Sequence, residues 1–154
     1  MLSTPNEIER IARMARAILE PIWCRWHLLD SGTVPPIPSL NTCGRSSLFL
    51  ERALRDGGID ASVCRGVPQD GLELGFFDGA SWRAHSWVEA EGRIIDITAD
   101  QFGAPPVVIV PHPERRYRGG GRDTAAPEAI ARRHRLVDEI WPLWLALASA
   151  KGRS

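Results

Sequence analysis

Residues 82–98 carry the sequence WRAHSWVEAEGRIIDIT, two runs of β-forming residues joined by Glu91-Gly92. A short loop of this composition between two such runs is typical of a two-residue β-hairpin. With that loop, three pairs of residues face each other: Ala90 and Arg93, Trp87 and Asp96, His85 and Thr98. This register places His85 and Asp96 diagonally on one face, close enough for a carboxylate to orient an imidazole. A three-residue loop would instead turn Asp96 to the other face.

The segment around Cys43, residues 41–54, has the pattern of a helix. Two polar residues able to cap, Asn41 and Thr42, precede an amphipathic run that stops at Gly57-Gly58. Cys43 is therefore expected in the first turn, where unpaired backbone N–H groups and the positive end of the helix dipole favour a thiolate over a thiol. In that position Cys43 is primed as a nucleophile.

Cys43, His85 and Asp96 are, in chain order, the side chains that acyl transfer by a thiol requires. His85 would take the thiol proton and later give it to the leaving group, while Asp96 would fix the tautomer of His85 and stabilise the imidazolium. Each residue alone also has a structural explanation: a small buried Cys, a packed strand His and an exposed carboxylate at a strand end. Their combination in this order favours a catalytic triad.

These three residues and their neighbours resemble the papain-like superfamily. The resemblance rests on the motifs CGRSSL at 43–48, AHSWVE at 84–89 and ID at 95–96. It points to the transglutaminase-like branch, which includes small bacterial cysteine peptidases that remove leader peptides during lasso-peptide maturation. The resemblance implies Cys43 as nucleophile, His85 as base and Asp96 as orienter, acting on a peptide or glutamine-type amide through a thioester. No cofactor and no metal are expected.

The resemblance lacks one feature of the papain relatives, a Gln a few residues before the Cys that donates to the oxyanion. Here residues 35–38 are Pro-Pro-Ile-Pro. The remaining donor candidates are Asn41, Gln101 and the backbone N–H of Cys43. Trp87, one step along the strand face from His85, is a candidate wall of the substrate groove, or alternatively it packs against the Cys43 helix.

The rest of the chain predicts an α+β domain. A helix that starts with a capping box at residues 4–7 carries apolar residues at helical spacing, and Pro21 should kink or end it. Strands are expected at residues 59–67 and 72–77, where they would extend the hairpin into one antiparallel sheet, and a last, buried strand at 107–110. The Gly-rich stretch 118–123 is either a mobile flap or a loop without a role.

A final helix begins near Pro127 and carries an amphipathic stripe. The expected architecture is a papain-like, transglutaminase-like core in which N-terminal helices and a C-terminal helix pack on the antiparallel sheet. Residues 1–154 are expected to form a single domain, since a chain of this length with 44% hydrophobic residues can bury one core.

Composition limits the partners and the compartment. Lys plus Arg equal Asp plus Glu at 19 each, so no nucleic-acid or membrane-surface partner is expected. The three cysteines show no paired pattern, which favours a reducing cytoplasm over a disulfide framework. No signal peptide is recognisable, and the longest apolar run, residues 141–148, is too short to span a bilayer. The expected partner is a peptide or protein substrate, which a separate recognition protein could deliver.

Two other functions, a transferase and a binding module, are compatible with these residues. An acyltransferase of the transglutaminase type would use the same triad but pass the acyl group to an amine. A non-enzymatic binding module on a decayed papain-like scaffold would keep the fold without the chemistry, and the missing Gln favours it somewhat. A metal site from Cys43, His85 and His112 lacks any supporting ligand spacing. A thiol-dependent amide hydrolase is the preferred interpretation.

Overall fold

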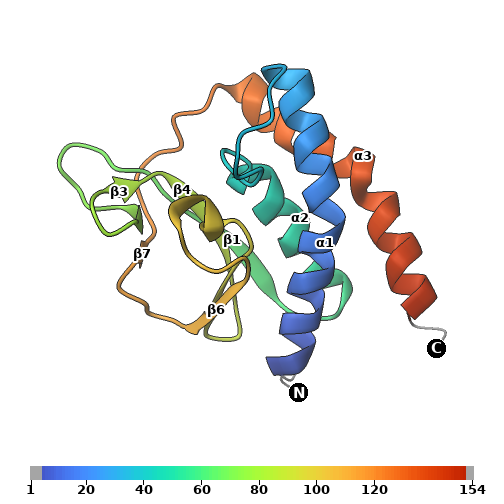
Figure 1. The fold of residues 1–154 in the computed structure, drawn as a ribbon. Coiled ribbons are helices and arrows are strands. Elements are labelled where there is room, and N and C mark those ends of the chain that lie inside the picture. The colour runs from blue at the N-terminus through green and yellow to red at the C-terminus, as the bar shows by residue number, and fades with distance from the viewer. Residues whose placement is uncertain (1–4, 152–154) are drawn as a thin grey trace.

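Three helices and two antiparallel sheets form the α+β fold of the computed structural model, which describes residues 5–151 (Figure 1). The helices are α1 (Pro5–Asp30), α2 (Cys43–Asp56) and α3 (Pro127–Lys151). The four-stranded sheet has the order β1 (Ala61–Gly66), β4 (His85–Ala90), β5 (Arg93–Asp96) and β6 (Val108–Pro111). The three-stranded sheet has the order β3 (Trp82–Arg83), β2 (Gly75–Phe77) and β7 (Tyr117–Arg118). A 3-10 helix, η1 (Ala99–Phe102), follows β5.

Helix α1 continues past Pro21 to Asp30, so the prediction that the helix could end at Pro21 is wrong. Pro21 has no N–H to give to the carbonyl of Ala17, but both residues are exposed and water can replace that hydrogen bond. Beyond Pro21, Trp23 and Trp26 are buried in the core and hold the helix in place. Thr4, the first residue of the expected capping box, lies outside the described residues.

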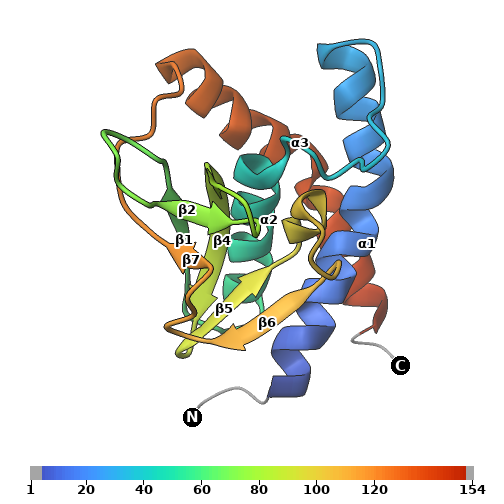
Figure 2. The same ribbon diagram turned by 60° about the vertical axis from the view of Figure 1, so that its left-hand side comes forward.

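Helix α2 lies between the four-stranded sheet and the other two helices (Figure 2). Its buried apolar face includes Phe49 and Leu50. The ring of Phe49 meets Trp141 and Trp144 of α3 edge-on, with centroids 5.8 and 6.2 Å apart. These contacts fix the axis of α2, and with it the position of Cys43 at the first residue of the helix.

The β-hairpin has the predicted register. Glu91 and Gly92 have positive φ angles of 51° and 73°, and Ala90 pairs with Arg93 across this two-residue loop. The ladder between β4 and β5 ends one pair before Trp87 and Asp96, and Asp96 pairs with Val108 of β6 instead. Apolar side chains on one face join the core beneath the helices: Val88, Ile95 and Ile97.

Two predictions about the sheets are wrong. Residues 82–90 break at Ala84, so Trp82 and Arg83 pair with β2 while His85–Ala90 pair with β1. Strand β2 therefore belongs to a second sheet and does not extend the hairpin. Strand β6 is not the last strand, because the chain returns as β7 to pair with β2. Segments as short as β2, β3 and β7 have no periodicity that a sequence pattern could reveal.

Two glycines allow the sheets to meet beside His85. Gly66 pairs with His85 across the ladder between β1 and β4, and a Cβ at Gly66 would overlap the backbone of Gly75 and Arg118. Gly75 has a φ of +101°, and a Cβ there would overlap the carbonyl oxygen of Arg83. Because only glycine fits, the second sheet can come close enough to enclose His85.

Within residues 5–151, none of the helices combines the length and the apolar character needed to cross a membrane. The same residues contain no group of three His, Cys, Asp or Glu side chains that could hold a metal ion. His112, the third ligand of the candidate metal site, lies beside Glu89 with Nε2 3.5 Å from Oε1.

Gly75→Ala is expected to destabilise the fold far more than Gly79→Ala. The two glycines have φ angles of +101° and +100°, so both variants bear the same cost of an L side chain at positive φ, about 1 kcal/mol. Only at Gly75 would the new Cβ also clash with backbone, which should add about 2–3 kcal/mol. Urea unfolding of both variants measures the difference. Equal losses of stability would show that the two sheets do not meet as closely as described.

Candidate functional site

Cys43 is the first residue of α2, and no side chain caps this helix. The Thr42 hydroxyl donates to the carbonyl oxygen of Ser39 (2.8 Å) and accepts a hydrogen bond from Ser46 (3.1 Å), so it is not directed to the N–H groups of the first turn. Asn41, the other expected cap, is exposed and has a φ of 62°. The half-buried thiol therefore lies at a helix terminus whose N–H groups lack a side-chain acceptor.

His85 and Asp96 form a buried hydrogen bond, with Nε2 2.6 Å from Oδ2. Both side chains are 0% exposed. The same Oδ2 accepts a hydrogen bond from the Tyr117 hydroxyl (2.9 Å), and Oδ1 accepts one from the backbone N–H of Thr98 (3.0 Å). A buried carboxylate with this many donors is stable as an anion, so Asp96 can hold a positively charged imidazole.

Aromatic rings surround the His85 imidazole. Phe102 and Phe76 meet it edge-on, with centroids 5.1 and 5.7 Å away, and Trp87 stacks on it at 6.2 Å. His85 Nδ1 is buried and forms no well-aligned hydrogen bond with any residue in the described range. Because Nε2 is taken by Asp96, Nδ1 is the nitrogen left for the Cys43 thiol, which interacts with His85.

The charges of the site favour a thiolate. Burial opposes ionisation of Cys43, but the hydrogen bond and charge of His85, the charge of Arg65 and the backbone N–H of Ser86 lower the pKa of the thiol from 9.0 to about 7. Burial also opposes a charge on His85, but Asp96 and Cys43 raise the pKa of the imidazole well above its usual range. At neutral pH the pair therefore favours thiolate beside imidazolium.

The pKa values of three further groups are also shifted: those of Tyr117 and Cys64 are raised, and that of Asp96 is lowered. Burial and the charge of Asp96 raise the pKa of Tyr117, so its hydroxyl stays neutral and donates to the carboxylate. His85 and the donors around Asp96 outweigh the effect of burial and lower the pKa of Asp96. Burial and Glu89 raise the pKa of Cys64 to about 12. Cys64 is thus an unreactive thiol in the same chain.

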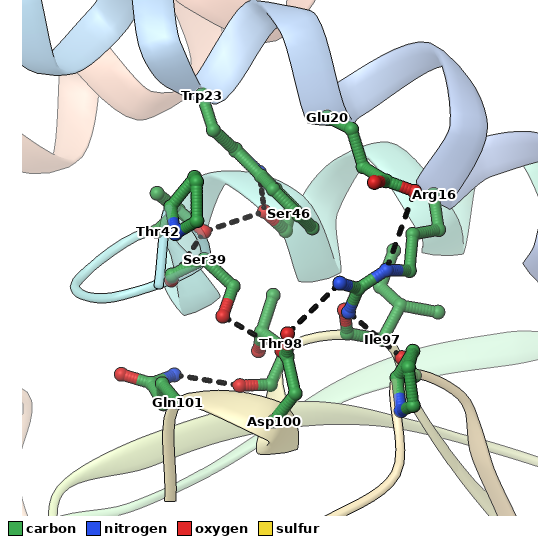
Figure 3. A network of polar contacts seen from close by, with 12 residues as sticks. Arg16, Glu20, Trp23, Ser39, Thr42, Ser46, Ile97, Thr98, Asp100 and Gln101 are labelled. Atoms are coloured by element: carbon green, nitrogen blue, oxygen red, sulfur yellow. Dashed lines mark hydrogen bonds and ion pairs between the residues drawn. The ribbon is translucent and has the colours of Figure 1, made fainter. Parts of the chain in front are cut away.

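A polar network fixes the loop that precedes Cys43 (Figure 3). Arg16 of α1 donates to Asp100 Oδ2 (2.8 Å), and the Ser39 hydroxyl donates to Asp100 Oδ1 (2.7 Å). The indole N–H of Trp23 donates to the Ser46 hydroxyl (2.9 Å) in the first turns of α2. Helix α1 thereby ties the start of α2 to the segment that follows Asp96.

The structure brings Cys43, His85 and Asp96 together, and it gives the other predicted site residues different positions. Gln101 donates Nε2–H to the carbonyl oxygen of Thr98 (3.0 Å) and accepts from the backbone N–H of Asn41 (3.3 Å), so it braces the loop before Cys43.

The prediction that Trp87 forms a wall of the groove is wrong. Its side chain is 1% exposed and packs edge-on against Tyr117, with centroids 5.2 Å apart. The alternative, packing against the Cys43 helix, is also not what is seen, because Trp87 belongs to the apolar cluster between the two sheets. The second sheet, which the sequence pattern does not reveal, covers this strand face.

A cavity of about 680 Å³ opens beside the aromatic rings around His85. Phe76 and Phe102 line it as well as contacting the imidazole, and three cationic side chains complete it: Arg115, Arg116 and Arg118. Arg116 and Arg118 are neutralised by Glu114 (2.8 Å) and Glu73 (3.1 Å). Neither Cys43 nor His85 is among the residues that line this cavity, and the aromatic rings separate it from the imidazole.

Three residues that act on the site escape the sequence patterns: Arg65, Asp100 and Tyr117. Arg65 lies on β1 and Tyr117 on β7, so they meet the candidate triad only through the tertiary fold. Asp100 follows β5 and acts through Arg16 and Ser39, which are distant in the chain. None is part of a local motif. Tyr117 is the sole tyrosine of the chain, but this fact alone does not predict its contact with Asp96.

His85→Ala is expected to raise the midpoint of Cys43 alkylation from about 7 to 9 or above. Without His85, burial, which raises the pKa of the thiol, would outweigh the remaining effects of Arg65 and the backbone N–H of Ser86. The measurement is the rate of iodoacetamide labelling of the Cys43 peptide by mass spectrometry as the pH is varied. Cys64 provides an internal reference that should stay unlabelled at neutral pH in both proteins. A midpoint that does not move would contradict the pairing of Cys43 with His85.

Asp96→Asn is expected to raise the same midpoint by about one pH unit, because the neutral amide no longer favours the imidazolium that stabilises the thiolate. The control is Asp138→Asn, which removes an exposed carboxylate of α3 that pairs with Arg52 (2.8 Å). The midpoint should be unchanged in the control. An equal shift in both variants would indicate a general structural effect and not a role of Asp96 toward His85.

No family model matches this chain, and no curated protein is similar to it. Among solved structures, the chain is similar to one described as "The crystal structure of genomics APC5867", with 20% sequence identity and a TM-score of 0.40. The similarity covers 94% of this chain and 79% of that one. A likeness of this size indicates neither a shared family nor a shared activity. Any function assigned to this chain therefore depends on the geometry around Cys43, His85 and Asp96.

Proposed function

We propose that the protein is a thiol-dependent amide hydrolase, a cysteine peptidase of papain-like, transglutaminase-like type. One observation carries the proposal: His85 Nε2 lies 2.6 Å from Asp96 Oδ2, which leaves Nδ1 for a Cys43 thiol whose pKa is lowered to about 7. A thiolate, an imidazolium and an orienting carboxylate in this order are the groups that covalent acyl transfer needs.

The reaction proceeds in two steps. Cys43 Sγ attacks the carbonyl carbon of the substrate amide, and a C–S bond forms as the carbonyl electrons move to oxygen. His85 gives its Nδ1 proton to the amide nitrogen, the C–N bond breaks, and the amine leaves a thioester on Cys43. A water molecule then attacks the thioester carbon while giving a proton to Nδ1. The C–S bond breaks, which releases the acid and restores the thiolate and the imidazolium.

The backbone N–H of Cys43 is the best of the three candidate donors to the oxyanion. It lies in the first turn of α2, where no side chain competes for the N–H groups. Gln101 already holds Thr98 and Asn41, and Asn41 is exposed at a turn with positive φ. In this proposal Gln101 and Asn41 position the nucleophile and do not touch the substrate oxygen.

The hydrolase is tested with a mixture of peptides, by following new peptide ends and the intact mass of the acid-quenched protein. Wild type is expected to release new ends and to accumulate an acyl adduct on Cys43. Cys43→Ser should abolish both, whereas Cys64→Ser, which replaces the thiol with a pKa of about 12, should leave both in place. His85→Ala should lower kcat/KM by about 10²–10⁴-fold.

The remaining outcomes separate the rival functions. If an added amine is found in the product in place of water, the protein is an acyltransferase that uses the same thioester. If peptides bind to wild type and to Cys43→Ser alike and no acyl adduct forms, the fold is a binding module and the hydrolase is excluded. Efficient cleavage by the isolated protein would show that no separate recognition protein has to deliver the peptide.

A further inference from the structure

A second cavity, of about 230 Å³, adjoins the reactive pair. Its lining includes Gly44 and Ser86, the residues that directly follow Cys43 and His85 in the chain. Arg65 of β1 and Arg133 of α3 form its charged wall. A group bound here would therefore lie next to the thiolate and not at the far end of a substrate groove.

Two cationic side chains that line this cavity, Arg65 and Arg133, share a single carboxylate there. Asp123, in the loop between β7 and α3, accepts a hydrogen bond from Arg133 (2.8 Å) and lies 3.6 Å from Arg65 Nε. Arg65 donates an N–H of its terminal Nη1 to the Ser86 hydroxyl (2.7 Å). Its Nε is buried and has no hydrogen bond among residues 5–151. Two guanidinium groups thus share one carboxylate in this cavity, and one buried N–H has no acceptor among the described residues, so the cavity can hold a further oxygen acceptor.

Arg133 also lies against the backbone beside the nucleophile. A Cβ placed on Gly44 would be 2.9 Å from Arg133 Nε and 3.1 Å from Cδ. The absence of a side chain at Gly44 therefore lets the guanidinium reach the first turn of α2. A substrate bound to Cys43 would meet Arg133 within one or two residues of the reacting carbonyl.

We propose that Arg65 and Arg133 form a subsite for a substrate carboxylate beside Cys43, and that Asp123 occupies this subsite in the free protein. The identification of the ligand as substrate rests on the proposed hydrolase. The carboxylate could be an Asp or Glu side chain next to the scissile amide, or the C-terminal carboxylate of a peptide. Both present two oxygens that match a guanidinium fork.

The backbone on both sides of Asp123 is held, so an incoming carboxylate would replace only the Asp123 side chain. Gln69 donates to the carbonyl oxygen of Arg122 (2.6 Å). Gly120 is held to β1 by backbone hydrogen bonds with Arg65 (2.9 Å) and Val67 (3.1 Å), three residues before Asp123. Asp123 itself is held by Arg133, Arg65 and the backbone N–H of Ala125 (3.0 Å). Exchange of Asp123 for an incoming carboxylate conserves the ion pairs, so no buried charge is left without a partner.

The subsite is tested without any peptide by comparing iodoacetate with its neutral analogue iodoacetamide. The readout is the rate of Cys43 alkylation by iodoacetate divided by the rate with iodoacetamide. This ratio is then divided by the same ratio measured for glutathione, which corrects for the different intrinsic reactivities of the two reagents. In Asp123→Asn the carboxylate no longer competes, and this normalised ratio should rise about tenfold over wild type. Adding Arg133→Gln should return it to the wild-type level or lower.

Arg132→Gln is the matched control, because Arg132 lies one residue earlier on α3 and binds Asp30 (2.7 Å) instead. It should leave the ratio unchanged. If Asp123→Asn does not fold, Arg133→Gln alone should lower the ratio from its wild-type value while Arg132→Gln does not. A ratio that is insensitive to Asp123 and Arg133, or equally sensitive to Arg132, would overturn the subsite.

Matched peptides distinguish the two sources of the carboxylate: Asp against Asn beside the scissile bond, and a C-terminal acid against its amide. In one of these two pairs, wild type should cleave the acidic peptide faster than the neutral one, and Arg133→Gln should cleave both at the same rate. That pair identifies the source of the carboxylate. If iodoacetate is preferred but no peptide is cleaved, the subsite stands and the hydrolase fails. If peptides are cleaved without a preference for either acid, the hydrolase stands and the substrate subsite is overturned.

Discussion

The buried hydrogen bond between His85 and Asp96 is the interaction on which the rest of this fold depends. A carboxylate without solvent is stable only if donors surround it, and Asp96 receives them from Thr98, Tyr117 and His85. These donors come from both sheets, since Tyr117 lies on β7 and His85 on β4. The second sheet is therefore more than a cover for the strand face. It completes the environment that keeps Asp96 charged, and close contact at Gly66 and Gly75 is what lets it do so.

The helical half of the structure presents the thiol to this pair. Helix α2 is anchored by the aromatic side chains of α3, and its first turns are tied to α1 through the hydrogen bond between Trp23 and Ser46 (Figure 3). The link from Arg16 through Asp100 to Ser39 joins the loop before Cys43 to the strand that carries Asp96. A long, well-packed helix is a rigid support, so the position of the nucleophile is set by core packing and not by a flexible loop.

Local patterns in the sequence predict the parts of the site that depend on neighbouring residues. Glu91-Gly92 specifies the two-residue turn, and the helix signal around Cys43 places the thiol correctly. The same patterns miss what depends on contacts between distant segments: the second sheet, the burial of Trp87, and the donation from Tyr117 to Asp96. Strands of two or three residues leave no periodic signal, and a single Pro such as Pro21 predicts a break that exposure to water makes unnecessary.

Arg65 connects the Cys43 thiol electrostatically to the neighbouring cavity of about 230 Å³, because it acts on the thiol and also lines the cavity. Arg65 favours the Cys43 thiolate and also lies 3.6 Å from Asp123, so a carboxylate in the cavity is expected to offset part of the effect of Arg65 at Sγ. With two unpaired guanidinium groups the thiolate would be more stable, and a more stable thiolate is a weaker nucleophile. In the proposed subsite a carboxylate is always present, first from Asp123 and then from the substrate, so the field at Sγ would stay nearly constant. Under that proposal the cavity would select a substrate by its charge without changing the reactivity of the Cys43 thiolate.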